Sequence, residues 1–443
     1  MVSAAEQLAA NLNFGALAKA DELKKRIWFT LGALLIYRLG TYIPLPGIDP
    51  AAWQQVFQSQ AGGILGMFNM FAGGGINRMA IFALNIMPYI SASIIIQLLT
   101  TVSPKLEALK KEGEAGRKTL NQYTRYLTVI LATFQAYGIA VGLQGAGNVV
   151  SEPGLFFLIS TTVTLTGGTM FLMWLGEQIT SRGIGNGISL IILAGIVAEL
   201  PSALASMLEL GRQGALSTGL ILLVIVMAVA VIAFIVFMER AQRRLLIQYP
   251  KRQVGNKMFE GQSSHLPLKL NTSGVIPPIF ASSLLLLPAT VANFNAGQGP
   301  EWFQWLNTQL SHGRPLFLIL YISLIVFFAF FYTAIVFNPT ETADNLKKHG
   351  GFIPGIRPGE RTAEYIDYVL SRVTVVGAIY LAIVCLIPEI LISYAAVPFY
   401  FGGTSLLIVV SVTMDTVAQV QGYLLAHQYE GLIRKSKLRG RRR

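Results

Sequence analysis

Stretches of about 20 apolar residues recur along the chain and alternate with short polar segments. Because a helix needs roughly 20 residues to cross a bilayer, each stretch predicts one membrane span. Ten such stretches are present, at about residues 27–43, 79–100, 124–143, 155–175, 188–207, 217–238, 273–293, 315–337, 373–393 and 399–420. The pattern therefore predicts an all-α polytopic membrane protein with ten transmembrane helices.

One further apolar stretch is too short to cross. It runs from Ile64 to Ala72, and Gly73-Gly74-Gly75 separates it from the second predicted span, which starts at Met79. A short apolar piece on a glycine hinge is typical of a re-entrant helix, and such broken backbone is tolerated at membrane depth only against protein or a water-filled cavity. We therefore expect the chain to surround a cavity that holds this piece. An apolar interfacial loop is the alternative.

Composition supports the membrane class. Of the 443 residues, 53% are hydrophobic and only 13% are charged, with a mean hydropathy of +0.56. A soluble domain carries about twice that charged fraction. The single cysteine, Cys385, excludes an intrachain disulfide. No phosphate-binding glycine loop, paired metal ligands or nucleophile constellation is present, so we expect neither an enzyme nor a cofactor.

The positive charge lies on one side of the predicted topology. With the N-terminus inside, the inner side holds 30 of the 34 lysines and arginines. They lie in residues 1–26, 101–123, 176–187, 239–272, 338–372 and 421–443, together with Arg125 at the edge of a span. The exceptions are Arg38, Arg78, Arg212 and Arg314. The positive-inside rule thus places both termini in the cytoplasm. The first 26 residues end in Lys24-Lys25-Arg26, so we expect the first apolar stretch to stay as a span rather than be cleaved.

Two cytoplasmic loops, 239–272 and 338–372, are much longer than ordinary connections. The first contains Arg240–Leu246, which alternates enough to predict a strand or hairpin that projects from the membrane. The second contains the run from Gly350 to Glu360, whose glycines and prolines would present Arg357 at the tip of a turn. Long ordered loops often carry function. A solvated arginine without a partner is the alternative for Arg357.

Internal repetition divides the chain into halves. Met87-Pro88-Tyr-Ile90-Ser-Ala-Ser93 in the second predicted span is similar to Ile276-Pro277-Pro-Ile279-Phe-Ala-Ser282 in the seventh. The two spans run in opposite directions, and proline-broken segments at corresponding positions indicate an inverted repeat with the working site between the halves. The halves would be residues 27–207 and 208–420.

The interior of the predicted halves is apolar. Ile86, Ile90 and Ile279 fall near mid-membrane, with Ile188 and Ile192 one turn apart. Branched aliphatic side chains around a waist can block ions by dewetting, although an isoleucine in a membrane helix can equally face lipid. Polar Ser91, Ser93 and Gln97 are expected to contact another helix, with Ser282 and Ser283 as candidates. Ionisable groups are nearly absent from the second, fifth and seventh predicted spans, which favours a passive or externally driven conduit over an ion-coupled transporter.

Several motifs in register resemble one family, bacterial SecY, over the chain from about Leu23 to Tyr429. They are Tyr42-Ile-Pro-Leu-Pro-Gly-Ile-Asp49, Met67-Phe-Asn-Met-Phe71, Ile86-Met-Pro-Tyr-Ile-Ser-Ala-Ser-Ile-Ile-Ile-Gln97, Met173–Thr180, Arg182-Gly-Ile-Gly-Asn-Gly-Ile188, Gly350–Glu360 and Tyr400–Ile408. The resemblance implies a clamshell of ten helices in two inverted halves. Such a clamshell opens an hourglass pore for unfolded polypeptides and also opens sideways to release hydrophobic segments into lipid.

The family's functional residues carry over by position. The pore constriction falls on the isoleucines Ile86, Ile90, Ile188, Ile192, Ile279 and Ile408. The re-entrant plug falls on the stretch from Ile64 to about Gly75, including Met67, Phe68, Asn69, Met70 and Phe71. The lateral gate includes Ser91, Gln97, Ser282 and Ser283, and partner docking falls on the basic loops at Arg243, Arg244, Lys251, Arg252 and Arg357.

The resemblance also implies partners and a location. The partners are the companion subunits SecE and SecG, the SecA motor ATPase, the ribosome with its nascent chain, signal sequences and unfolded preproteins; the location is the bacterial inner membrane. The tail 421–443 has no family motif. From their charge alone we expect its basic residues to contact ribosomal RNA or anionic lipids, or simply to be solvated. Pro277-Pro278 and Ser273 depart from the family pattern and are expected to alter how the seventh span tilts. A small-solute secondary transporter is the alternative function, favoured by the inverted repeat and the broken helices.

Overall fold

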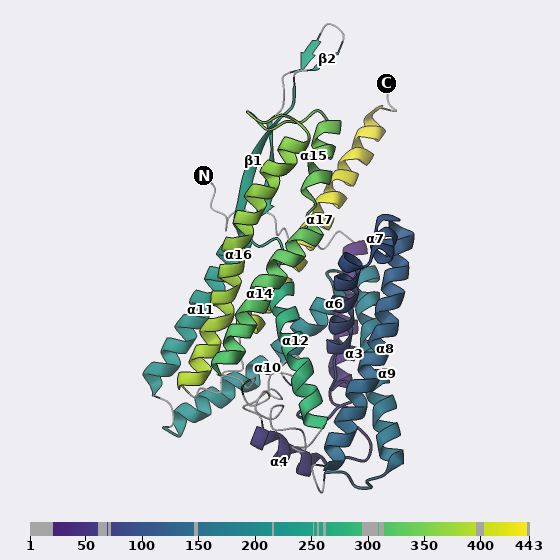
Figure 1. Ribbon diagram of the computed structural model, residues 1–443, viewed down its shortest axis with the longest axis vertical. Coiled ribbons are helices and arrows are strands. Elements are labelled where there is room, and N and C mark those ends of the chain that lie inside the picture. Colours follow the sequence, from purple (N-terminus) through teal and green to yellow (C-terminus); the bar gives the residue numbers. More distant parts are fainter. Residues whose placement is uncertain are drawn as a thin grey trace. The chain divides into compact units, whose positions relative to one another are not determined.

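The computed structural model describes residues 21–60, 69, 72–145, 149–214, 217–250, 252–254, 257–259, 263–294, 309, 314–395 and 403–440. This part of the chain is mostly helical (Figure 1). It divides into two compact units. Unit 1 comprises Met1–Ser206, Leu287–Asn307 and Ile408–Arg443, and unit 2 comprises Met207–Leu286 and Thr308–Leu407.

Unit 1 is built around a group of packed helices. Its elements, two of which run slightly past the boundary, are α3 (Asp21–Gly40), α4 (Pro50–Gln60), α6 (Met87–Val102), α7 (Pro104–Lys111), α8 (Glu114–Gly145), α9 (Leu155–Arg182), α10 (Gly187–Arg212) and α17 (Gly403–Gly440). Helix α8 packs against both α6 and α9, and α3 packs against α9. Small residues of α8 such as Ala132, Ala136 and Ala140 are fully buried, which allows this close approach.

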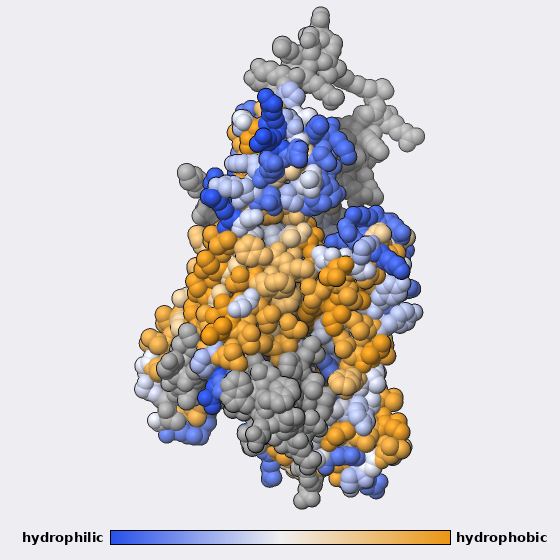
Figure 2. All heavy atoms as spheres, in the orientation of Figure 1, coloured by the Kyte–Doolittle hydropathy of each residue, from blue (hydrophilic) through white to orange (hydrophobic). Residues whose placement is uncertain are grey.

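Unit 2 combines membrane helices with an extramembrane head. It contains α11 (Thr218–Arg240), four strands, α12 (Ile276–Phe294, which ends in unit 1), α14 (Pro315–Val336), α15 (Pro339–Lys348) and α16 (Glu360–Ala395). Helix α14 packs along α16, and α15 packs against the same helix. Figure 2 shows hydrophobic side chains over the middle of these helices and hydrophilic ones where α15 and β1 lie. This is the pattern of a membrane-embedded region that continues into a solvent-exposed polar region.

The helices confirm a polytopic membrane protein. Within the described residues, seven helices are long and apolar enough to cross a membrane, and an eighth span is counted if α6 and α7 are taken together. The other two predicted spans coincide with α3 and α12. Helix α3 carries Lys24, Lys25, Arg26 and Arg38, and the apolar helix described in α12 is Ile276–Leu285.

The second predicted span does not begin at Met79, as the sequence pattern suggested. Residues 72–86 form successive turns, and α6 begins only at Met87. Met79 and Asn85 have φ angles of 45° and 49°, which a right-handed helix cannot contain. Pro88 then lies in the first turn of α6, where its missing N–H costs no hydrogen bond. At the other end α6 and α7 meet at an angle of 100° before Pro104.

The two similar sequence motifs begin their helices in the same way. Met87 is the first residue of α6 and Ile276 the first of α12, so Ile90 and Ile279 are each the fourth residue. Each helix is preceded, two residues earlier, by a residue with positive φ: Asn85 at 49° and Gly274 at 62°. The sequence repeat is therefore also a repeat of local backbone structure.

The loop 239–272 contains a β-ribbon, as its alternation predicts. Strand β1 (Gln242–Gln248) pairs antiparallel with β4 (Ser263–Lys269), with Leu245 opposite Leu266. Farther out, β2 (Arg252–Val254) pairs with β3 (Lys257–Phe259). Alternate residues of β1 and β4 join a buried cluster of Leu245, Ile247, Leu268, Leu346, Ile353 and Ile366. This cluster attaches the ribbon to α15 and to the start of α16.

Candidate functional site

The predicted constriction residues are turned toward protein rather than lipid. Ile86 and Ile408 are fully buried, Ile90, Ile192 and Ile279 are at most 9% exposed, and Ile188 is half-buried. Each lies within the first six residues of a helix or just before it. Ile86 and Ile90 belong to the start of α6, Ile188 and Ile192 to α10, Ile279 to α12 and Ile408 to α17. Ile279 belongs to unit 2 and the other five to unit 1. Their assembly into one ring stays a prediction.

The segment before α6 is anchored by backbone hydrogen bonds to the chain that follows α3. The Leu45 N–H donates to the Met79 carbonyl at 2.9 Å, and the Ile81 N–H donates to the Ile43 carbonyl at 3.0 Å. The indole of Trp53 donates to the carbonyl of Ile76 at 2.7 Å. These bonds replace the helical ones that residues 72–86 lack, and they place Ile86 at the entrance to α6.

The glycine turn is fastened by an arginine. Arg38, at the end of α3, donates through Nη1 to the Gly73 carbonyl at 2.6 Å and through Nη2 to the Tyr42 hydroxyl at 3.0 Å. The guanidinium carbons of Arg38 and Arg78 lie 4.9 and 4.1 Å from the centroid of the Tyr42 ring. Two of the four arginines outside the positive-inside pattern therefore have a structural role.

Most of the predicted plug lies outside the described residues, namely Ile64, Met67, Phe68, Met70 and Phe71. Asn69 is described and is buried. Its side-chain Oδ1 accepts from the Asn77 N–H at 2.8 Å, and its carbonyl accepts from the Gly74 N–H at 2.9 Å. These two bonds tie Asn69 to the same turn that Arg38 holds.

The predicted lateral-gate residues are polar groups within apolar helices. On α6, Ser91 is buried, and the Gln97 Nε2 donates to Ser93 Oγ at 3.3 Å. On α12, Ser282 donates to the carbonyl of its own helix at Ile279, at 2.9 Å. Within the described part of the chain, the buried Oε1 of Gln97 and Oγ of Ser283 have no hydrogen-bond partner. Unit 1 contains α6, and unit 2 contains this part of α12, so the seam between them stays a prediction.

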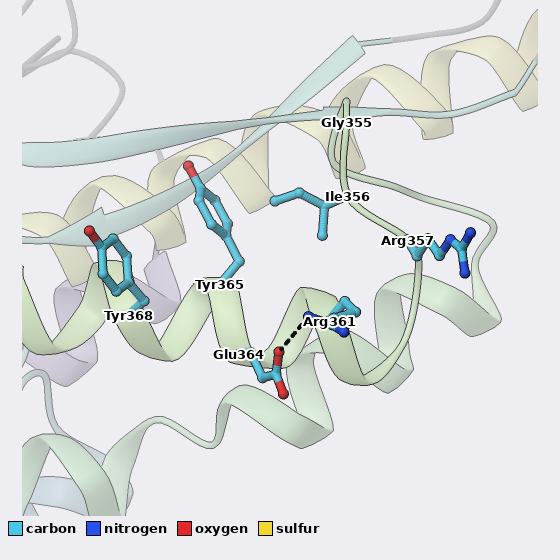
Figure 3. A pocket seen from close by; sticks show the side chains of 7 residues that line it. All are labelled: Gly355, Ile356, Arg357, Arg361, Glu364, Tyr365 and Tyr368. Atoms are coloured by element: carbon cyan, nitrogen blue, oxygen red, sulfur yellow. Dashed lines mark ion pairs between the residues drawn. The ribbon is translucent and has the colours of Figure 1, made fainter.

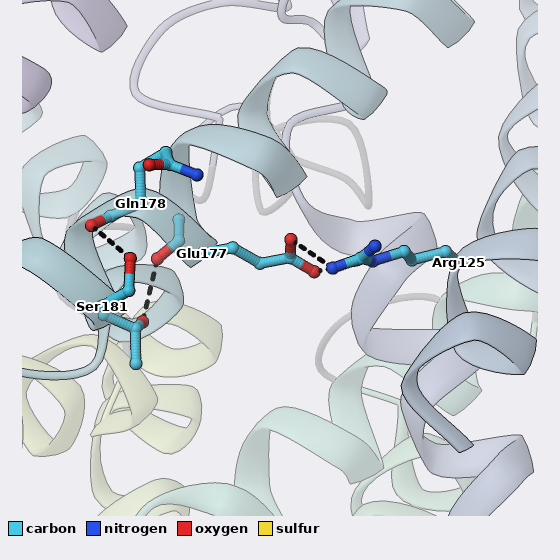
Figure 4. Close-up of polar contacts among 6 residues, drawn as sticks. Arg125, Glu177, Gln178 and Ser181 are labelled. Atoms are coloured by element: carbon cyan, nitrogen blue, oxygen red, sulfur yellow. Dashed lines mark hydrogen bonds and ion pairs between the residues drawn. The ribbon is translucent and has the colours of Figure 1, made fainter. Parts of the chain in front are cut away.

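An ion pair joins α8 to α9. Arg125 donates to Glu177 through Nε at 2.9 Å and through Nη2 at 2.7 Å, a bidentate geometry. Figure 4 shows the ends of the two side chains facing each other. The Arg125 and Glu177 side chains are 46% and 30% exposed, so the pair contributes at most about 1 kcal/mol. It adds one polar link to the packing of α8 on α9, the two helices that contact α6.

The candidate docking surface is the part of unit 2 outside the membrane helices, namely the β-ribbon of residues 242–269 with α15 and the loop that leads to α16. Arg243 and Arg244 of β1 are exposed, opposite Leu268 and Pro267 of β4. Lys251 lies outside the described residues, and Arg252 is described only by its backbone in β2. Arg244 shares the outer face of β1 with exposed Leu246, whereas Arg243 lies on the same face as Leu245 and Ile247, which join the buried cluster, but is exposed at the start of the strand.

Arg357 lies between two turns, at residues 354–355 and 358–359, rather than at the tip of one turn as predicted. Gly355 and Gly359 have φ angles of 83° and 108°, conformations that favour glycine, and Arg357 between them is exposed. A pocket of about 510 Å³ adjoins these turns and is lined by Gly355, Ile356, Arg357, Arg361, Glu364, Tyr365 and Tyr368. In Figure 3 the two tyrosines rise from α16 on the side of Ile356, while the Arg357 guanidinium points away from them. Within the described part of the chain the Arg357 side chain has no hydrogen bond or ion pair, and its role in docking stays a prediction.

A second charged surface lies on α7 of unit 1. This short exposed helix carries Lys105, Lys110 and Lys111. Lys111 donates a hydrogen bond to Glu107, and this bond and the lysine's charge lower the pKa of that carboxyl. At neutral pH, α7 therefore presents both charge types outside the membrane.

Apolar helices long enough to cross a membrane, together with polar segments outside them, define a polytopic membrane protein. Comparison with known proteins identifies its family. A family model described as SecY matches residues 80–417. The chain is 58% identical over 426 residues to the protein translocase subunit SecY of Vibrio cholerae, covering 95% of this chain and 96% of that one. The corresponding Escherichia coli K12 protein is 57% identical over 423 residues, with 95% and 96% covered. The chain therefore belongs to the SecY family.

Solved structures share the fold. A protein-conducting channel superimposes with a TM-score of 0.65 at 18% identity, covering 90% of this chain and 92% of that one. A SecY described as having a plug domain that stabilises the closed state scores 0.64 at 20% identity, with the same coverage. Sec61 in a canine ribosome–channel complex scores 0.62 at 17% identity, again covering 90% and 92%. These likenesses confirm the all-α polytopic fold.

The sequence interpretation missed the residues that hold the functional elements in place. Arg38, Trp53 and the Arg125–Glu177 pair each bond to a residue at least 23 positions away. Residue type and spacing give no signal for such pairs. The one available hint was the unusual position of Arg38 outside the positive-inside pattern.

Proposed function

We propose that the chain is the central, pore-forming subunit of a protein translocation channel. It passes unfolded secretory polypeptides across the membrane and releases hydrophobic segments sideways into lipid. Membership of the SecY family carries the proposal, and the burial of all the constriction candidates except half-buried Ile188 supports it.

The proposed mechanism uses the apolar waist as a seal. Ile86, Ile90, Ile188, Ile192, Ile279 and Ile408 surround a narrow passage from which water withdraws, so ions are blocked without a binding site. The stretch 64–75 is the plug beside this waist. A signal sequence separates the seam near Ser91, Gln97, Ser282 and Ser283, where polar groups weaken the packing of helix on helix.

Energy for transport comes from partners. The chain pairs with SecE and SecG, and its exposed Arg243, Arg244 and Arg357, with Lys251 and Arg252, receive the SecA motor ATPase or the ribosome. Family membership supports a place in the bacterial inner membrane. The charge distribution supports an orientation with both termini in the cytoplasm. The basic tail contacts anionic lipids or ribosomal RNA. The chain itself performs no catalysis.

Reconstituted vesicles test the proposal. The purified chain with SecE and SecG is placed in vesicles, and SecA, ATP and an unfolded preprotein are added outside. Protection of the preprotein from protease inside the vesicles supports the channel; vesicles without this chain are the control. Saturable uptake of a small solute driven by an ion gradient, without preprotein protection, would instead establish a secondary transporter.

A further inference from the structure

The loop that joins α9 to α10, residues 183–186, is held by two other helices. From α3, the Thr30 hydroxyl accepts from the Ile184 N–H at 3.1 Å, and Arg26 donates to the Gly183 carbonyl at 3.3 Å. From α17, the Gln419 Oε1 accepts from the Gly185 N–H at 2.9 Å. Thr30 lies 154 residues before its partner, and Gln419 lies 234 residues after its own. All three contacts lie within unit 1.

The loop also fixes the first turn of α10. The Thr180 hydroxyl accepts from the Gly187 N–H at 2.9 Å, and Asn186 Oδ1 accepts from the Ile188 N–H at 3.1 Å, which is an N-cap. Gly187 sits so close to the Gly176 carbonyl of α9 that any side chain there would overlap it. The Ile188 N–H is thus hydrogen-bonded to Asn186, and Ile188 also packs against Gly176 of α9.

Apolar packing completes the junction. Leu23, Ile184 and Leu424 form a buried cluster with contributions from Ile27 and Val420. The Arg26 guanidinium lies 5.2 Å from the centroid of the Tyr423 ring. The loop is therefore fixed in position between α3 and α17 rather than resting on one helix.

Two sets of constriction residues depend on the helices that meet here. Helix α10 carries Ile188 and Ile192, and α17 carries Ile408, eleven residues before Gln419. That separation is about 16 Å along a helix. A shift of α10 relative to α17 at the junction would change the register of these isoleucines. The buried N–H groups of Ile184 and Gly185 oppose such a shift, because it would leave them unpaired.

We propose that Thr30 and Gln419 are positioning residues that hold Ile188 and Ile192 in register with Ile408. The inference rests on the proposed function, since these isoleucines are assigned to the constriction there. Loss of either acceptor lets the start of α10 move and loosens the seal while the helices stay folded.

The test compares paired variants in the reconstituted complex. Gln419→Leu removes the acceptor, and Gln419→Glu retains one. Gln421→Leu is the control, because the side chain of Gln421 has no hydrogen bond to the described part of the chain. Thr30→Val is paired with Thr413→Val, because among the described residues the Thr413 hydroxyl bonds only to the Val409 carbonyl of its own helix. Vesicle ion leak, preprotein translocation and the melting temperature are measured for each.

We expect Gln419→Leu and Thr30→Val to raise the leak about fivefold, the factor that one hydrogen bond contributes to an equilibrium. Their melting temperatures should match those of the controls, and Gln419→Glu should restore the seal. Leaks equal to those of the controls would overturn the inference. A leak that accompanies a lowered melting temperature and is not rescued by Gln419→Glu would also overturn it. Failure of the unmodified vesicles to translocate would refute the proposed function instead.

Discussion

Replacing Arg38 should loosen the segment that leads into α6. The Arg38→Met variant loses a charged hydrogen bond to the Gly73 carbonyl at 2.6 Å, a second bond to Tyr42 at 3.0 Å and the contact of the guanidinium with the Tyr42 ring. The first is worth about 1.5–3 kcal/mol, and the ring contact about 0.5–1 kcal/mol at an exposed site. The sum is roughly 2–4 kcal/mol of local stability.

Amide hydrogen exchange measures this loss directly. A change of about 2 kcal/mol increases the population of the open segment roughly 30-fold, so amides within residues 72–86 should exchange faster by at least that factor. Arg212→Met is the matched control, because Arg212 also lies outside the positive-inside pattern but, within the described residues, its side chain bonds only to Glu209 on its own helix, at 3.0 Å. Arg38→Lys should be intermediate. Exchange in Arg38→Met no faster than in Arg212→Met would refute the anchoring of this segment by Arg38.

Three further predictions concern the waist, the plug and the docking surface. Replacing Ile90 or Ile279 with serine should raise ion leak and relax the selection of signal sequences, and normal conductance in both variants would contradict the assignment of the waist. Deleting residues 64–72 should leave a stable protein with raised leak, whereas an unchanged leak would remove the plug assignment. Arg357→Ala should reduce motor-driven transport more than ribosome binding, since the side chain is exposed between two turns; equal losses would indicate misfolding.

Hydropathy located the membrane helices well, because a helix that crosses lipid needs about 20 consecutive apolar residues and such a run is visible in the sequence. The predicted spans 155–175, 188–207 and 315–337 correspond to α9 at Leu155–Arg182, α10 at Gly187–Arg212 and α14 at Pro315–Val336. It failed where backbone conformation overrides hydropathy. The apolar run after Met79 is not helical until Met87, because two residues with positive φ interrupt it and tertiary hydrogen bonds stabilise the turns.

The candidate site divides in the same way. The strand pattern of 240–246 and the glycines around Arg357 are local signals. The structure confirms the ribbon, but it places Arg357 between two turns rather than at the tip of one. The contacts that hold those elements in place are not local. Gly185 bonds to a glutamine 234 residues away, and nothing in the residues near either position indicates the pairing. Functional assignments of individual isoleucines came from family resemblance, since apolar side chains carry no distinctive chemistry.

Cross-linking to a translocating polypeptide tests the central claim most directly. A photo-reactive residue is placed at position 90, where Ile90 is buried, or at position 134, where Phe134 of α8 is 56% exposed. A preprotein is then arrested part-way across the vesicle membrane. A conducting pore at the predicted waist should give cross-links from position 90 and none from position 134. Cross-links from position 134 alone, or from neither position while the preprotein is protected, would contradict a path through the waist.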